Sequence, residues 1–177
     1  MARTYIPTAS EYGNAVPEGL LMDPRELKST IVRYLTEHYS GTLATVREDG
    51  MPQASGITYV SDGLILYFGM DPESQKKKNV DRNPNVGMAI FKDYYRFDRT
   101  RAVHLAGRCE IVKDDEEIAL AGKLFTEKFP KLAEYSGMFE WADRVGPVPM
   151  YKITPKIVAY MDYEKMGFNR YETLELG

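Results

Sequence analysis

The stretch that decides the fold is residues 63–91, GLILYFGMDPESQKKKNVDRNPNVGMAIF. Residues 64–68 form an apolar run bounded by glycines, which predicts a buried strand. The pair Asp71-Pro72 then predicts the start of a helix, with the aspartate as N-cap and the proline at the first helical position. This helix must end near Asn83-Pro84, because a residue before proline avoids the α region. Residues 86–91 predict the next strand, so a short helix joins two strands.

The predicted helix start carries polar groups that suit a phosphate. Ser74, Lys76, Lys77 and Lys78 lie in it, and the N-terminus of a helix offers unpaired N–H groups and a favourable dipole. The alternative is an ordinary helix capped by Asp71, with the lysines on a solvated face. Spacing alone favours the ordinary helix.

Composition limits the class of protein. A chain of 177 residues with one cysteine, Cys109, predicts a single domain with no internal disulfide and fits a reducing, cytoplasmic compartment. Its formal net charge of -3 argues against a general nucleic-acid binder. No signal sequence is visible, and no apolar run approaches the roughly 20 residues of a membrane span, so we expect no membrane association.

The order of elements predicts a fold that is mainly β with flanking helices. A helix begins at Asp23-Pro24, a second one covers 114–128, and Gly107 marks a break or bulge in a long strand. Short sequential strands joined by tight turns predict an antiparallel barrel with helices at its edges. We expect an extended arm over 1–22, a folded domain over 23–163 and a tail over 164–177. The predicted strands are 42–46, 53–60, 64–68, 86–91, 102–112, 150–154 and 156–163, the last two interrupted at Pro155.

The sequence carries no catalytic motif of its own. His38 and His104 with one cysteine are too few for a histidine and cysteine zinc site, so no metal site is expected. We find no phosphate-binding loop, dinucleotide fingerprint or nucleophile elbow. His38 reads as a helix cap, and His104 lies on the more polar face of its strand. Any catalysis would therefore depend on a bound cofactor.

Several segments in order resemble the pyridoxamine 5'-phosphate oxidase-like family, the FMN-binding split barrels. The most specific is SQKKKNVDRNPNVGMAI (74–90), which is similar to the family pattern Ser-x-Lys-x-x-Asn-aliphatic-x-x-Asn-Pro. The resemblance runs from residue 41 to about 163. Its other segments are TLATV (42–46), EDGMPQASGITYV (48–60), LILYFG (64–69), RAVHLAGRCEIV (101–112) and YKITPKIVAY (151–160).

The resemblance implies an antiparallel split β-barrel that forms a homodimer, with FMN in clefts between the subunits. Ser74 and Lys76 would hold the FMN phosphate, with Gln75 and Lys77 nearby. Ala102 and His104 would reach the cofactor of the partner. The residues that would line the flavin are Gln53, Ala54, Ser55, Gly56, Ile57 and Thr58 of the second strand and Tyr67, Phe68 and Gly69 of the third.

Two departures from the family argue against a true pyridoxamine phosphate oxidase. Ser55 stands where those oxidases carry an arginine, and DYEKMGFNRYETLEL (162–176) replaces their C-terminal substrate-binding element. We therefore expect an FMN-dependent oxidoreductase that transfers hydride or electrons between a reduced donor and a small substrate. A non-catalytic flavin carrier or sensor and a deazaflavin-dependent reductase are the alternatives, and haem-binding relatives share the fold. Candidate substrate walls, or equally a dimer interface, are Tyr94, Tyr95, Arg96, Phe97, Arg99 and Trp141.

Overall fold

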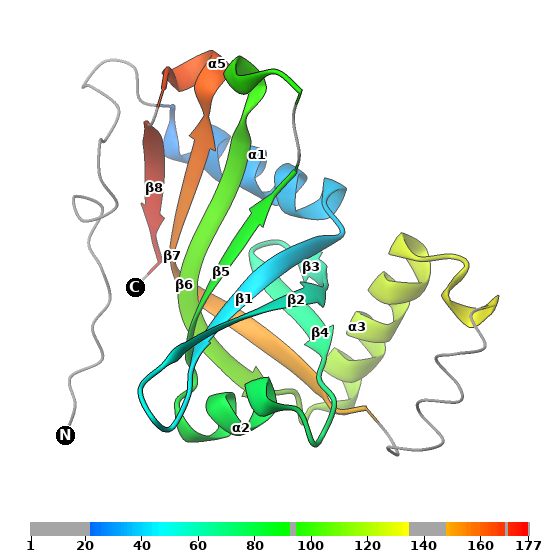
Figure 1. Cartoon of the computed structure of the whole chain (residues 1–177). Helices are drawn as coiled ribbons and strands as arrows, with labels where there is room; N and C mark the ends of the chain where they lie inside the picture. Colours follow the sequence, from blue (N-terminus) through cyan, green and yellow to red (C-terminus); the bar gives the residue numbers. More distant parts are fainter. Residues whose placement is uncertain (1–21, 93–94, 135–147, 169, 177) are drawn as a thin grey trace.

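A computed structural model describes residues 22–92, 95–134, 148–168 and 170–176. The fold is mainly antiparallel β with flanking helices, as predicted (Figure 1). Residues 1–21 of the predicted arm lie outside the described residues, as do Tyr94 and Trp141. The strands are β1 (Ser40–Val46), β2 (Pro52–Thr58), β3 (Val60–Asp62), β4 (Ile65–Gly69), β5 (Asn85–Phe91), β6 (Arg101–Ile111), β7 (Met150–Asp162) and β8 (Tyr171–Glu175).

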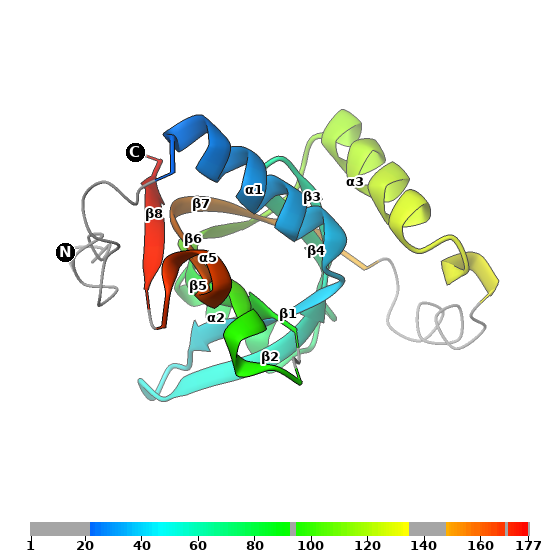
Figure 2. The ribbon, with the colours of Figure 1, turned by 90° about the horizontal axis from the view of Figure 1, so that it is seen from above.

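The sheet curls into a split barrel in the order β2-β1-β5-β6-β7-β4-β3. Its edge strands β2 and β3 are consecutive in the chain, where one strand was predicted over 53–60. They are separated at Tyr59, whose hydroxyl donates to the carbonyl oxygen of Leu35 at 3.0 Å. Tyr59 is fully buried, so the chain turns inward there and crosses from one edge of the sheet to the other. Seen from above, the strands surround a central space with α1 (Pro24–Glu37) along one side (Figure 2).

The two longer helices form where the sequence predicts them. Asp23 caps α1 by accepting from the N–H of Arg25 at 2.8 Å, and Pro24 occupies the first turn. Asp114 caps α3 (Asp115–Lys128) by accepting from the N–H of Glu117 at 2.9 Å. His38 is the C-cap of α1, as expected.

The helix of the deciding stretch begins later than predicted. α2 (Gln75–Arg82) has Ser74 as its N-cap, not Asp71. Asp71 instead accepts from the N–H of Glu73 at 2.8 Å, and its carbonyl oxygen accepts from the N–H of Ser74 at 3.1 Å. Asp71 and Pro72 therefore belong to a tight turn before the helix, and the oxygens of Asp71 accept hydrogen bonds within that turn.

Pro155 does not divide the last strand, contrary to the prediction. β7 continues through it because the register with β6 shifts there: Gly107 pairs with Pro155, whereas Ala106 pairs with Ile157. Proline is tolerated at such a bulge because the ladder is already interrupted. A Cβ on Gly107 would lie 2.4 Å from the carbonyl oxygen of Thr154, so glycine permits the close approach of the two backbones. The predicted bulge at Gly107 is confirmed.

The sheet also extends beyond residue 163, into the segment predicted as a tail. After a short helix, α5 (Tyr163–Met166), β8 pairs antiparallel with the second half of β7. The first half of β7 pairs with β4, and β6 follows β7 along nearly its whole length. The buried Glu172 of β8 accepts from the N–H of Met22 with both carboxylate oxygens, at 3.0 and 2.9 Å.

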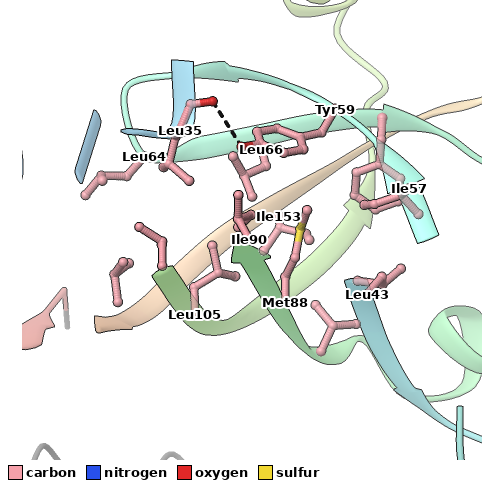
Figure 3. Close-up of a cluster of buried hydrophobic side chains, with 14 of the residues drawn as sticks. Leu35, Leu43, Ile57, Tyr59, Leu64, Leu66, Met88, Ile90, Leu105 and Ile153 are labelled. Atoms are coloured by element: carbon pink, nitrogen blue, oxygen red, sulfur yellow. Dashed lines mark hydrogen bonds between the residues drawn. The ribbon is translucent and has the colours of Figure 1, made fainter. Parts of the chain in front are cut away.

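Two clusters of apolar side chains stabilise this arrangement. The larger one fills the barrel, and Figure 3 shows Leu43, Met88 and Leu105 meeting there from neighbouring strands. The smaller one joins β3 and β4 to α3 through Val60, Tyr67 and Ala121. Among the described residues, no helix is long and apolar enough to cross a membrane.

Candidate functional site

Six of the predicted site residues lie in two separate places. One is the α2–β2 corner, which we define by Gln53, Ser74, Gln75, Lys76 and Asn79. The other is the His104 cavity, of about 460 Å³. The residues that line the His104 cavity are Phe91, Lys92, Tyr95, Phe97, Thr100, Ala102, His104 and Met161.

Buried amides fix the geometry of the α2–β2 corner. Asn79, 1% exposed, donates from Nδ2 to Oε1 of Gln53 at 2.9 Å and to Oγ1 of Thr45 at 3.0 Å. Its Oδ1 accepts from Nε2 of Gln75 at 2.9 Å. Thr45 and Gln53 are a cross-strand pair of β1 and β2. The network therefore holds the start of α2 in one position beside β2.

The cations of α2 differ in what they contact. Lys77 Nζ is 2.6 Å from Oδ2 of Asp81, and this hydrogen bond raises the pKa of Lys77. Lys78 is exposed. Lys76 is half-buried and makes no ion pair with any described residue. Of the three, Lys76 is therefore the cation best placed to hold an anion.

Backbone N–H groups add to the anion-binding capacity of the corner. The N–H groups of Gln75 and Lys76 lie in the first turn of α2, where a helix provides no backbone acceptor. Ser74 Oγ donates to the carbonyl oxygen of Asp71 at 2.8 Å and accepts from the N–H of Lys77 at 3.4 Å. Its hydroxyl would have to rotate to donate to a phosphate, so we expect Lys76 to contribute more.

The second strand presents two kinds of side chain. Gln53 and Ser55 are half-buried and Ile57 is buried, and they face the barrel. The other three predicted residues, Ala54, Gly56 and Thr58, are exposed. Because β2 is an edge strand in the described sheet, alternate backbone N–H and C=O groups point away from β1. A planar ligand with polar edges could bind to them.

The predicted third strand is β4, which pairs with β3 on one side and with β7 on the other, and two of its three predicted residues have buried side chains. Tyr67 is 2% exposed and its hydroxyl donates to Oε1 of Glu117 on α3 at 2.9 Å. Burial and the neighbouring Glu117 carboxylate raise the pKa of this phenol. Phe68 is fully buried in the barrel core. Of the three predicted residues, Gly69 alone is exposed.

Ala102 and His104 lie away from the corner of the same chain. Strand register places Gly56, Thr42, Ala89 and His104 in one row across β2, β1, β5 and β6. Three strand spacings separate the ends of this row by about 14 Å. Ala102 is buried, and burial lowers the pKa of His104. His104 makes no hydrogen bond with the described residues.

Small side chains surround His104 on the outer face of the sheet. Ala44 pairs with Ala54 and Gly87, and Gly87 pairs with Ala106. A groove of about 510 Å³ runs over Ala44, Gly87 and Ala106. Figure 1 shows these strands in front of α1, which lies on the other side of the barrel. We call this surface the small-residue face: Ala44, Ala54, Gly56, Gly87, Ala89 and Ala106.

Sequence reasoning missed Asn79 of the corner and its hydrogen-bond partner Thr45 on β1. A signal for Asn79 was present, because asparagine is a poor residue for a helix interior and this one lies inside the motif quoted above. Thr45 carried no comparable signal, since threonine is ordinary in a strand. The candidate walls Tyr95 and Phe97 line the His104 cavity. Arg96 pairs with Asp98 and Arg99 pairs with Glu164.

Known proteins match the chain over most of its length. The sequence pattern of the family described as "Pyridoxamine 5'-phosphate oxidase" matches residues 27–162. General stress protein 26 of Bacillus subtilis (strain 168) is 29% identical over 110 residues, 62% of this chain and 75% of that protein. The crystal structure of Rv2991 from Mycobacterium tuberculosis has a TM-score of 0.67 at 21% identity, covering 93% of this chain and 98% of that one. A heme binding protein from Mycobacterium smegmatis has a TM-score of 0.66 at 19% identity, covering 88% and 59%.

Proposed function

The chain belongs to the pyridoxamine 5'-phosphate oxidase family, and we propose that it is an FMN-binding flavoprotein that transfers hydride or electrons between a reduced donor and a small substrate. The observation that carries this proposal is the α2–β2 corner. There, Lys76 has no ion pair among the described residues and lies in the first turn of a helix that Asn79 fixes against β2. A phosphate placed there would meet one ammonium group and free N–H groups.

The residues of the corner fit a flavin mononucleotide in two respects. Lys76 and the first N–H groups of α2 would hold the phosphate, and the outward backbone groups of β2 would hydrogen-bond the polar edge of the ring. Bound flavin would supply the hydride or electron chemistry, since the sequence carries no catalytic motif of its own. The protein would bind and orient the cofactor and exclude water.

We propose that the functional unit is a homodimer joined through the small-residue face. His104 lies about 14 Å along the sheet from β2 of its own chain, counting three strand spacings. Two copies that pair these faces around a two-fold axis can place His104 of one chain close to β2 of the other. Short side chains permit the close approach that such an interface requires.

The absorbance spectrum of the purified protein tests the cofactor. We expect the two visible bands of oxidised flavin, and we expect the protein stripped of its ligand to take up one FMN per chain. A protein that binds no FMN at micromolar concentration would overturn the proposal. A single band near that of a deazaflavin would identify the deazaflavin-dependent alternative.

The same preparation separates an oxidoreductase from a flavin carrier or sensor. Anaerobic addition of a reduced nicotinamide nucleotide should bleach the flavin bands if the protein accepts hydride from such a donor. Dithionite serves as the control, because it reduces any accessible flavin. Bleaching by dithionite, with none by the reduced nucleotide or by other biological donors, would favour the carrier.

Haem binding is the second candidate, and His104 favours it. Its imidazole is half-buried, lacks a partner among the described residues and faces a cavity with aromatic walls, and histidine is a common axial ligand of haem iron. One structural relative is named a heme binding protein. Addition of hemin should then give a sharp Soret band that His104→Ala shifts. A Soret band that is the same in both proteins would exclude His104 as the ligand.

A further inference from the structure

Two polar groups in the His104 cavity have no partner among the described residues. Lys92 and His104 both line it, and neither makes a hydrogen bond or ion pair with those residues. The neighbouring arginines are different, because Arg101 pairs with Asp162 at 3.1 Å and Arg99 pairs with Glu164. Among the described residues that line this cavity, Lys92 is therefore the cation that remains available.

The rest of the cavity is apolar and partly aromatic. Phe97 is held in place by Tyr163 and Phe168, with ring centroids 5.4 Å away in each case. Ala102 and Met161 form a cross-strand pair that lines the same cavity. A preformed aromatic wall beside short and flexible apolar side chains suits a flat ring.

The size of the cavity suits a small molecule. Its volume of about 460 Å³ is within the range of ordinary small-molecule sites. An ammonium group attracts an anion, and a neutral histidine presents one N–H donor whichever tautomer it adopts. The cavity thus combines one positive charge, one N–H donor and an aromatic wall.

We propose that the His104 cavity binds a small planar aromatic molecule carrying one anionic group. The ring packs against Phe97 and Met161, and the anion accepts hydrogen bonds from Lys92 and His104. For the flavoprotein proposed above, such a molecule is the substrate class. Only this assignment as substrate rests on the proposed function. Binding itself needs no flavin and can be measured without it.

Anthranilate is a suitable probe, because it is a fluorescent aromatic carboxylate. We expect titration of the ligand-free protein to change its emission and to saturate. Anthranilamide has the same ring and amino group but no charge, and we expect it to bind about tenfold more weakly, as loss of a charge-assisted hydrogen bond predicts.

Three variants assign the binding to this cavity. Lys92→Met should weaken anthranilate about tenfold and leave anthranilamide unchanged, since only the anion uses the ammonium group. Phe97→Ala should weaken both ligands by about three- to tenfold, because both lose the aromatic contact. Lys78→Met is the matched control on the exposed side of α2, and it should change neither.

The outcomes separate this proposal from the flavin proposal. Equal affinity for the carboxylate and the amide, or equal losses in Lys92→Met and Lys78→Met, would overturn the anion site. Absence of saturable anthranilate binding would overturn the whole proposal. FMN uptake is measured on the same variants, and normal FMN binding with no anthranilate binding would leave the flavin site standing.

Discussion

At the scale of single residues, Lys76 and Lys78 form a matched pair on α2, one half-buried and one exposed. If Lys76 holds the FMN phosphate, Lys76→Ala should lose about 1.5–3 kcal/mol of FMN binding, or roughly ten- to more than a hundredfold in affinity. Riboflavin has no phosphate, so its affinity should not change. Lys78→Ala should have little effect on either ligand. Fluorescence titration measures all of these, and an equal loss of FMN and riboflavin in Lys76→Ala would show that Lys76 is not a phosphate ligand.

Asn79 supports a second prediction at the same scale. Asn79→Ala removes the amide that hydrogen-bonds Gln53, Thr45 and Gln75. Polar groups that lose their hydrogen-bond partner in a buried setting reduce the free energy of unfolding. We expect a loss of about 2–4 kcal/mol in the free energy of unfolding, measured with urea, together with weaker FMN binding. The exposed Asn85 provides the control, and Asn85→Ala should stay within about 0.5 kcal/mol of the parent. Parental stability in Asn79→Ala would show that the amide network does not fix α2.

At the scale of elements, two glycines with opposite surroundings test the bulge between β6 and β7. A Cβ at Gly107 would lie 2.4 Å from the carbonyl oxygen of Thr154 and 2.7 Å from Cα of Pro155, whereas at Gly122 nothing lies within 4 Å. Gly107→Ala should therefore destabilise the protein by more than about 2 kcal/mol, because backbone atoms must move. Gly122→Ala lies inside α3 and should stabilise it by about 0.5–1 kcal/mol. Thermal unfolding should shift the two midpoints in opposite directions, and a shift of the same sign would contradict this account of Gly107.

Elements whose signals are local were predicted well from the sequence. The start of α1 at Asp23-Pro24, the helix over 114–128 and the bulge at Gly107 are where the sequence places them. One local signal was misread, since Ser74 and not Asp71 caps α2, but two other misplaced features depend on distant partners. Pro155 can continue a strand because Gly107 lets β6 approach it, and β8 is a strand because β7 has a free second half to pair with.

The candidate site was predictable in part, for a related reason. Lys76 and Gln53 were found through the resemblance, and both lie at the α2–β2 corner. The side chains of Tyr67 and Phe68 are both buried. The sequence does not show this, because alternation along a strand does not say which of its faces meets another element. The separation of His104 from the corner follows from strand order, which the sequence does not reveal.

At the scale of the whole molecule, the small-residue face leads to a prediction about assembly. We expect sedimentation to show a species of twice the 20.2 kDa of one chain. Ala89 lies in the row between Thr42 and His104, so Ala89→Glu should place a charge in the interface and yield monomers with weakened FMN binding. Ala119→Glu, on the exposed surface of α3, should remain dimeric. A monomeric parent at micromolar concentration would refute the homodimer.

The pairing of β4 has a consequence for how the chain folds during synthesis. β4 is bonded on one side to its neighbour β3, but its other side pairs with β7, which leaves the ribosome much later. Until then the apolar segment from Ile65 to Phe68 lacks its second partner, and an unpaired apolar strand edge favours aggregation. The nascent chain should therefore depend most on chaperones between the emergence of β4 and that of β7.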